Sequence, residues 1–240
     1  MASGNIREAL AECCRQQTCM KVSRRYPRKT QLNRPEPDCF SIAITGTFGA
    51  GKSTVASIFG KEGIPVLDAD QLAHQVLEKP AIIRKIKEHF GEKVLAPDGS
   101  PDRKKLAAEV FNSSSQRRYL EKLTHPQVFS LLRRKMLDFW KKGSKMVCVE
   151  IPLLFETSAE DLFDFIVVVH ASPEAIKRRL RGIFTPEEIE KRWKSQWPQE
   201  RKLAHADFTI DNNHSFRDIR SQVKEILKKC QQRWNQSRLA

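Results

Sequence analysis

A glycine-rich octapeptide constrains this 240-residue chain more than any other feature of its sequence. The octapeptide, Gly46-Thr-Phe-Gly-Ala-Gly-Lys-Ser53, matches the pattern G-x-x-x-x-G-K-[S/T]. An apolar run, 40–45, precedes it, and Val55, Ile58 and Phe59 follow it at helical spacing. A strand, a glycine turn and a helix in this order predict a phosphate-binding loop, where backbone N–H groups and the helix dipole meet one anion. We therefore expect the chain to bind a nucleoside triphosphate.

Each position of the octapeptide has a chemical role in this prediction. The glycines let the backbone curl until successive N–H groups converge. Lys52 is placed to reach the β- and γ-phosphates, and the hydroxyl of Ser53 is placed to ligate Mg²⁺. The lack of an N-K-x-D signature disfavours a GTPase. The residues expected to contact the phosphates are Gly46, Thr47, Phe48, Gly49, Ala50, Gly51, Lys52 and Ser53.

Short apolar runs alternate with helical patterns along the rest of the chain. The runs cover 40–45, 64–67, 146–151, 165–170 and 208–210. Nearly continuous apolar runs of this length are typical of strands buried on both faces of a parallel sheet. Helical spacing covers 126–142 and the segment after Ser215, which we expect to be an N-cap. The predicted fold class is α/β, with a parallel sheet of about five strands.

Three segments depart from this alternation. Residues 71–142 contain only helical patterns and are expected to form a helical subdomain beside the sheet, where a second substrate binds. Residues 182–202 are polar, with little apolar surface to bury, and are expected to form a mobile lid. Residues 1–39 are basic and interrupted by prolines, and are expected to be a disordered extension of the domain that spans 40–240.

Acidic residues at two predicted strand ends each have two interpretations. Asp68 and Asp70 close the second run, where a carboxylate is able to accept a proton from a phosphoryl acceptor or to help hold Mg²⁺. Either residue is equally able to cap the helix that follows. Glu150, at the end of the third run, is either a member of the Mg²⁺ shell or an ordinary carboxylate.

Four cations in the segment Lys177-Arg-Arg-Leu-Arg181 lie at the end of a predicted helix. Cations there often only complement the helix dipole. At the root of a lid, one arginine is also placed to fold over the nucleotide and stabilise transition-state charge. The residues alone do not distinguish among the four.

The formal net charge of +14 first suggests a polyanionic partner such as nucleic acid. Residues 1–39 carry eight basic and four acidic residues, and residues 214–240 carry seven and two. Most of the excess therefore lies at the ends of the chain, outside most of the motifs, and no nucleic-acid partner is expected. The apolar runs are also too short to span a bilayer, so no membrane partner is expected.

The six cysteines show no C-x-x-C spacing, and four of them fall within the first 39 residues. A zinc site is therefore a weak hypothesis, and disulfides are not expected because the N-terminus lacks an apolar signal sequence. We therefore expect the cysteines to be reduced thiols, which is typical of a cytoplasmic protein.

Ordered motifs give residues 40–227 a family resemblance. They are Ile44-Thr-Gly46 with Gly49-Ala-Gly-Lys-Ser-Thr54, Gly63-Ile-Pro-Val-Leu-Asp-Ala-Asp70, His89-Phe-Gly91, Asp102-Arg103 with Leu106, Val110-Phe111, Leu123-Thr-His-Pro126, Ile151-Pro-Leu-Leu-Phe-Glu156, Gln196, Lys202 and Ala206-Asp-Phe-Thr-Ile-Asp-Asn212. In this order and spacing, the segment resembles dephospho-CoA kinase, the last enzyme of coenzyme A biosynthesis.

The resemblance implies a P-loop kinase fold with a helical substrate subdomain and a small lid. It implies transfer of the γ-phosphate of ATP, with Mg²⁺, to the ribose 3′-hydroxyl of dephospho-CoA, a small-molecule acceptor. The catalytic residues it implies are Asp70 as base, Lys52, and Arg181 as lid arginine. It adds Thr54 and Asn212 to the ATP site, and it assigns the CoA moiety to His125, Pro126, Leu153 and Leu154.

Some positions depart from the family pattern. Thr47 replaces a glycine at the loop tip, and the usual Arg-Asp-Gly of the lid is shortened to Arg181-Gly182. Residues 1–39 have no counterpart. Two other functions stay open: another small-molecule P-loop kinase acting on nucleosides or nucleotides, and a basic nucleic-acid-binding protein with a vestigial loop. The sequence lacks the interleaved aromatics of a base-stacking surface, which disfavours the second.

Overall fold

A computed structural model describes residues 39–111 and 113–237. The expectation about the N-terminal extension therefore lies outside the described residues, except for Cys39, which is buried. The described chain divides into two compact units. The helical unit comprises 69–134, and the sheet unit comprises 39–68 with 135–237.

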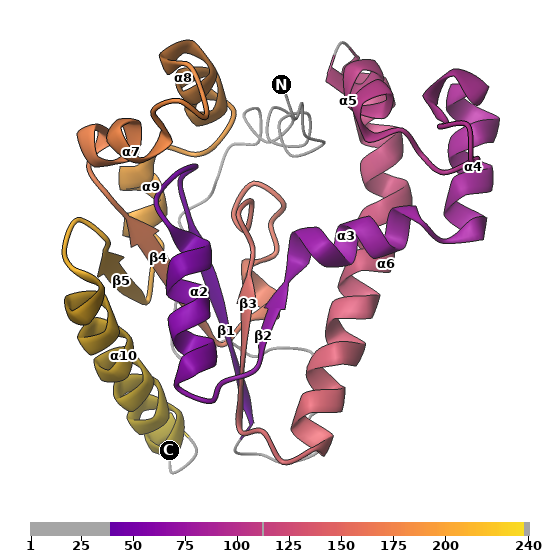
Figure 1. Cartoon of the computed structure of the whole chain (residues 1–240). Helices are drawn as coiled ribbons and strands as arrows, with labels where there is room; N and C mark the ends of the chain where they lie inside the picture. Colours follow the sequence, from indigo (N-terminus) through magenta and orange to yellow (C-terminus); the bar gives the residue numbers. More distant parts are fainter. Residues whose placement is uncertain (1–38, 112, 238–240) are drawn as a thin grey trace. The chain divides into compact units, whose positions relative to one another are not determined.

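The sheet unit is built on five parallel strands in the order β2-β3-β1-β4-β5 (Figure 1). Their bounds are β1 Phe40–Gly46, β2 Val66–Asp68, β3 Met146–Glu150, β4 Phe165–His170 and β5 Phe208–Asp211. The predicted α/β class with a parallel five-stranded sheet is confirmed. The register pairs Ile44 of β1 with Glu150 of β3, which in turn pairs with Asp68 of β2. The carboxyl ends of the three strands therefore meet at one edge of the sheet.

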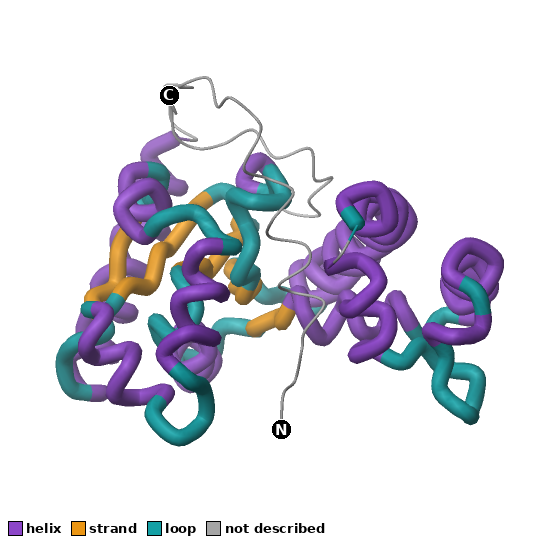
Figure 2. Tube along the Cα trace, turned by 90° about the horizontal axis from the view of Figure 1, so that it is seen from above, coloured by secondary structure: helices purple, strands orange, loops and turns teal. Residues whose placement is uncertain are grey.

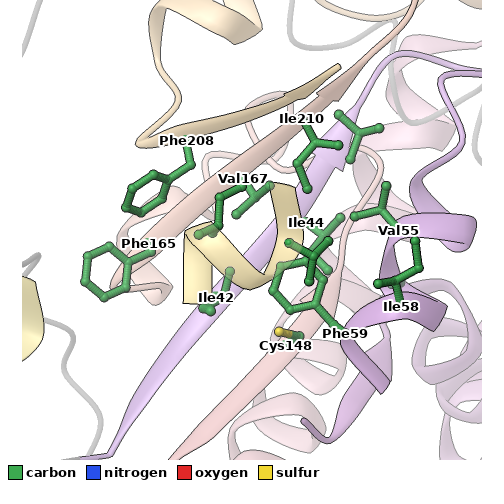
Figure 3. Close-up of a cluster of buried hydrophobic side chains, with 14 of the residues drawn as sticks. Ile42, Ile44, Val55, Ile58, Phe59, Cys148, Phe165, Val167, Phe208 and Ile210 are labelled. Atoms are coloured by element: carbon green, nitrogen blue, oxygen red, sulfur yellow. The ribbon is translucent and has the colours of Figure 1, made fainter. Parts of the chain in front are cut away.

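Two helices cover one face of this sheet, α2 (Lys52–Lys61) and α10 (Phe216–Ser237). Their apolar residues pack with alternate residues of four strands into one buried cluster, whose labelled members in Figure 3 are Ile42, Ile44, Val55, Ile58, Phe59, Cys148, Phe165, Val167, Phe208 and Ile210. The hydroxyl of Ser215 accepts a hydrogen bond from the backbone N–H of Asp218, as expected of the residue that caps α10. This packing fixes the start of α2 against the end of β1.

The remaining helices of the sheet unit follow β3 and β4. They are the 3-10 helix η3 (Glu160–Leu162), α7 (Pro173–Leu180), α8 (Pro186–Lys194) and α9 (Gln199–Ala204). Helices lie on both sides of the strands when the sheet is seen from above (Figure 2). A capping box between Thr185 and Glu188 begins α8. The expectation that the 182–202 segment buries little apolar surface is wrong, because Ile189 and Trp197 are both buried.

The helical unit consists of α3 (Ala69–Leu77), α4 (Pro80–Phe90), the 3-10 helix η2 (Glu92–Val94), α5 (Arg103–Phe111) and the first part of α6 (Ser114–Lys141). The predicted start of a helix at Pro126 is wrong, because Pro126 lies inside α6. Leu120 precedes the proline and Val128 and Leu132 follow it, and all three are buried. Burial on both sides of the proline outweighs the missing N–H and keeps the helix continuous. Within the described ranges, no helix is long and apolar enough to cross a bilayer.

Candidate active site

The predicted phosphate loop runs from the last residue of β1 to the first turn of α2. Gly51 is the N-cap of α2 with φ +89°, in the left-handed region that favours glycine. A Cβ at Gly46 would lie 2.1 Å from the carbonyl oxygen of Val169, so that no other residue fits against β4. The glycine pattern therefore has two local causes, one conformational and one steric.

The ammonium group of Lys52 lies against the backbone of the loop. Its Nζ donates to the carbonyl oxygen of Gly46 at 3.1 Å and to that of Thr47 at 2.9 Å. The Lys52 residue is only 8% exposed. The loop thus holds a cation at the positive end of α2, an arrangement suited to the phosphates of a nucleotide.

Ser53 lies beside the acidic residue at the end of β3. Its Oγ donates to Oε1 of Glu150 at 2.8 Å. Because Asp68 pairs with Glu150 in the register, the end of β2 adjoins this pair. In the described parts of the chain, no three His, Cys, Asp or Glu residues are grouped to hold a metal ion. A hydroxyl and a carboxylate are nonetheless ligands that Mg²⁺ accepts when phosphates and water complete its shell.

The tip of the loop contacts the polypeptide that follows α7. The N–H of Phe48 donates to Oε1 of Gln196 at 2.9 Å, and Nε1 of Trp193 donates to the Phe48 carbonyl at 3.1 Å. Thr47, the departure from the family pattern, is buried, and its Oγ1 is 3.4 Å from Oε1 of Gln199. A threonine side chain is therefore accommodated at this position.

The exit of the loop contacts the residue after β5. Nδ2 of Asn212 donates to the carbonyl oxygen of Ala50 at 2.7 Å, and Asn212 is buried. A Cβ at Gly51 would lie 2.0 Å from the same Nδ2. The backbone carbonyl of Asn212 accepts a hydrogen bond from Nη2 of Arg179. Asn212 is thus placed at the loop, as one side of the nucleotide site requires.

Arg179 is one of the four cations in the segment Lys177–Arg181 that the sequence alone did not distinguish. Among the cations at the end of α7, its guanidinium lies 3.9 Å from the position of a Cβ at Gly51. The helical phase explains this placement, because Ile176 and Leu180 of the same helix pack on Gly49. The signal was present in the spacing, but it needed the knowledge that α7 packs on the loop.

Arg181, the arginine favoured from the resemblance, is the C-cap residue of α7 and is exposed. It lines a cavity of about 510 Å³ together with Lys177, Arg178, Phe184 and Ile189, among others. Nζ of Lys177 lies 3.7 Å from Oε1 of Glu190 on α8. The cavity therefore has a basic wall from α7 and an apolar wall from the segment around α8.

A buried ion pair supports the loop that follows β3. Lys202 Nζ lies 2.8 Å from Oε1 of Glu156, and both side chains are at most 1% exposed. The same carboxylate oxygen accepts the N–H of Trp197 at 2.8 Å. Burial lowers the pKa of Lys202, and the nearby Glu156 charge opposes that shift. Leu153 and Leu154, which precede Glu156 in the same loop, are both buried.

Thr54 lies in the first turn of α2, and three further predicted site residues belong to the helical unit. Asp70 lies in the first turn of α3, two residues after the end of β2. His125 and Pro126 lie within α6, where the His125 ring is 5.9 Å from that of Phe129. Burial lowers the pKa of His125, which favours the neutral imidazole.

Comparisons with known proteins agree with one another. The family model of dephospho-CoA kinase (CoaE) matches residues 40–218. A dephospho-CoA kinase of Bacillus thuringiensis is 40% identical over 198 residues, which cover 81% of this chain and 96% of that protein. One of Arabidopsis thaliana is 39% identical over 189 residues, covering 78% and 82%.

Solved structures agree with these sequence matches. Dephospho-CoA kinase from Campylobacter jejuni is 28% identical with a TM-score of 0.56, covering 80% of this chain and 97% of that one. TT1252 from Thermus thermophilus is 35% identical with a TM-score of 0.71 and the same coverage. The resemblance inferred from the ordered motifs is confirmed.

Proposed function

The chain belongs to the dephospho-CoA kinase family, and we propose that it transfers the γ-phosphate of ATP to the 3′-hydroxyl of the ribose in dephospho-CoA. The products are coenzyme A and ADP. The observation that carries the proposal is the family match over 40–218, which includes the whole phosphate loop with Lys52 inside it. The chain is accordingly a transferase with a hydroxyl acceptor, and its ATP is a co-substrate.

The nucleotide side of the reaction is assigned to the loop. The N–H groups of residues 46–54 and the Lys52 ammonium bind the β- and γ-phosphates, and Asn212 flanks them at the loop exit. Ser53 and Glu150 provide the oxygen ligands for Mg²⁺. When bound, Mg²⁺ neutralises phosphate charge; this role is part of the proposal and rests on the hydroxyl–carboxylate pair.

The acceptor side is assigned to Asp70 and to the helical unit. Asp70 accepts the proton of the ribose 3′-hydroxyl. The hydroxyl oxygen forms a bond to the γ-phosphorus of ATP, while the bond from that phosphorus to the oxygen shared with the β-phosphate breaks. Arg181, at the root of the lid, 182–202, stabilises the charge on the transferred group. The CoA moiety is bound by His125, Pro126, Leu153 and Leu154, with the helical subdomain, 71–142, as the acceptor-binding part of the domain 40–240.

The proposed partners are small molecules, with no nucleic acid or membrane among them. We place the reaction in the cytoplasm. Support comes from the described cysteines Cys39, Cys148 and Cys230, which are buried thiols. Burial raises the pKa of both Cys148 and Cys230, so that these two stay in the unreactive thiol form.

An acceptor panel tests the proposed function. Purified protein with Mg²⁺ and ATP is offered dephospho-CoA, nucleosides and nucleoside monophosphates, and ADP release is measured for each. Turnover with dephospho-CoA alone is expected. Turnover with nucleosides or nucleotides but not with dephospho-CoA would instead assign the chain to another small-molecule kinase activity.

Two variants test the assigned roles in the same assay. Lys52→Ala and Asp70→Ala are each expected to lower kcat at least about a hundredfold, because one removes the phosphate cation and the other removes the base. Asp98→Asn is the control, since Asp98 is an exposed acid of the helical unit whose Oδ1 accepts hydrogen bonds from the N–H and the hydroxyl of Ser100. Unchanged turnover in either variant would remove that residue from the mechanism.

A further inference from the structure

Three residues around the end of α8 surround one residue at the tip of the phosphate loop. Gln196 accepts the N–H of Phe48, Trp193 donates to its carbonyl, and Arg192 lies over its ring at 4.7 Å. We call this set of interactions the tip contact. The residues involved are separated by about 145 positions in sequence, so the contact exists only in the folded chain.

Further contacts join the residues of the tip contact to one another. Gln196 donates its own N–H to the carbonyl of Trp193 at 3.0 Å, which keeps the two side chains on one turn of backbone. The guanidinium of Arg192 also lies 4.6 Å from the Phe184 ring, and the Phe48 and Phe184 rings meet edge to face at 5.2 Å. Cation–π and edge-to-face contacts of these distances are attractive. The segment around α8 thus presents one donor and one acceptor to the loop.

Each of these two hydrogen bonds orients one peptide plane of the loop. A trans peptide is planar, and its N–H and C=O point in opposite directions. The N–H of Phe48 belongs to the same peptide as the carbonyl of Thr47, which accepts the Lys52 ammonium at 2.9 Å. The bond to Gln196 therefore turns the Thr47 carbonyl toward Lys52.

The peptide between Phe48 and Gly49 is oriented in the same way. The carbonyl of Phe48 belongs to the same peptide as the N–H of Gly49. Because Trp193 holds that carbonyl at 3.1 Å, the N–H of Gly49 is turned away from α8. The orientation of two successive peptides in a loop that binds anions through its N–H groups is therefore set by side chains of another segment.

We propose that Gln196 and Trp193 are positioning residues for phosphate binding: they orient the two peptides on either side of Phe48 and, through the Thr47 carbonyl, the ammonium of Lys52. This inference rests on the proposed use of a nucleoside triphosphate, and it does not depend on which acceptor is phosphorylated. The family's loop motif assigns phosphate binding to the loop itself, whereas the tip contact adds a requirement from residues of 182–202.

Two variants, each of which removes one hydrogen-bonding group, test the proposal. Gln196→Met keeps the length of the side chain and removes the acceptor, and Trp193→Phe keeps an aromatic ring and removes the N–H donor. Affinity for ATP and for inorganic tripolyphosphate is measured by equilibrium titration without any acceptor, together with Tm and the KM for dephospho-CoA. Lys194→Ala is the matched control, because Lys194 is an exposed residue of the same helix.

In each variant, the affinities for ATP and for tripolyphosphate are expected to fall by the same factor, about fivefold, because one neutral hydrogen bond is lost. Tm and the KM for dephospho-CoA are expected to stay unchanged. The control is expected to bind both ligands like the parent. Unchanged affinity in both variants would overturn the proposal, as would weaker binding of ATP alone. A loss accompanied by an equal loss of dephospho-CoA affinity and a lower Tm would also overturn it, since it would indicate a general structural role. Failure of dephospho-CoA as an acceptor would instead overturn the proposed function and leave these titrations valid.

Discussion

Asn212 shows how one amide side chain determines which residue is allowed in a distant loop. Its Nδ2 bonds the Ala50 carbonyl and occupies the space that a Cβ at Gly51 would need. Asn212→Ala removes the hydrogen bond and leaves the loop exit without lateral support. We expect ATP affinity to fall about fivefold, measured by equilibrium titration. Asn235→Ala, an exposed position on α10, is the control; equal ATP affinity in the two variants would contradict the assigned role.

His125 makes the stability of the chain depend on pH. Its pKa is lowered by burial in the folded state, whereas the unfolded chain returns it toward the ordinary value of 6.5. As the pH falls below 6.5, the unfolded state binds the proton first, so the free energy of unfolding decreases until the folded pKa is passed. His125→Asn removes this effect. Urea unfolding at about pH 7.5 and about pH 5 should show a smaller decrease for the variant than for the parent. An equal decrease in both would show that His125 does not contribute.

The strands and the phosphate loop were predictable from sequence because their signals are local. The apolar runs coincide with the five strands to within about two residues, since buried parallel strands need continuous apolar side chains. The start of α6 was not predictable, because the local preference of Pro126 is overridden by burial of the flanking helix faces. Arg179 and Gln196 were missed as loop contacts for a related reason. Their partners in the loop, Gly51 and Phe48, lie more than 120 and more than 140 positions away, and helical spacing alone does not show which distant segment a helix face contacts.

The Glu156–Lys202 pair ties α9 to the loop after β3. Lys202 also donates to the Pro152 carbonyl at 3.3 Å, which in turn receives the Thr45 hydroxyl at the end of β1. Lys202→Met leaves the Glu156 carboxylate buried without its cation, which is expected to lower the free energy of unfolding by about 3–5 kcal/mol. Urea unfolding measures the change.

A second variant separates the charge effect from the loss of packing. In Glu156→Gln with Lys202→Met, the side-chain amide oxygen still accepts the N–H of Trp197 and no uncompensated charge remains. This double variant is expected to be more stable than Lys202→Met alone. Equal stability of the two would show that the buried charge is not the main cost.

The net charge of +14 is unevenly distributed along the chain. The segment 1–39 and the segment 214–240 together hold 15 of the 43 basic residues and only six of the 29 acidic ones. At the phosphate loop only a few cations are placed, with Lys52 inside the loop and Arg179 beside it. Total charge is therefore a poor guide to this site, because binding of a triphosphate depends on the orientation of donors more than on their number.

Removal of residues 1–38 tests whether the kinase activity needs the basic N-terminal segment. The family match begins at residue 40, where β1 also begins. Phe40 is fully buried, and its N–H donates to the Lys145 carbonyl at 2.9 Å. A chain that starts at Cys39 keeps all of these contacts. Its kcat, its KM for ATP and dephospho-CoA and its Tm are expected to match those of the full chain within about twofold for the kinetic constants.

A chain that starts at Ile42 is the comparison, since it loses a fully buried aromatic residue and is expected to be less stable by about 3–5 kcal/mol. A large loss of activity on removing only residues 1–38 would mean that this segment takes part in the reaction, and the site would then have to be extended beyond the family's matched range.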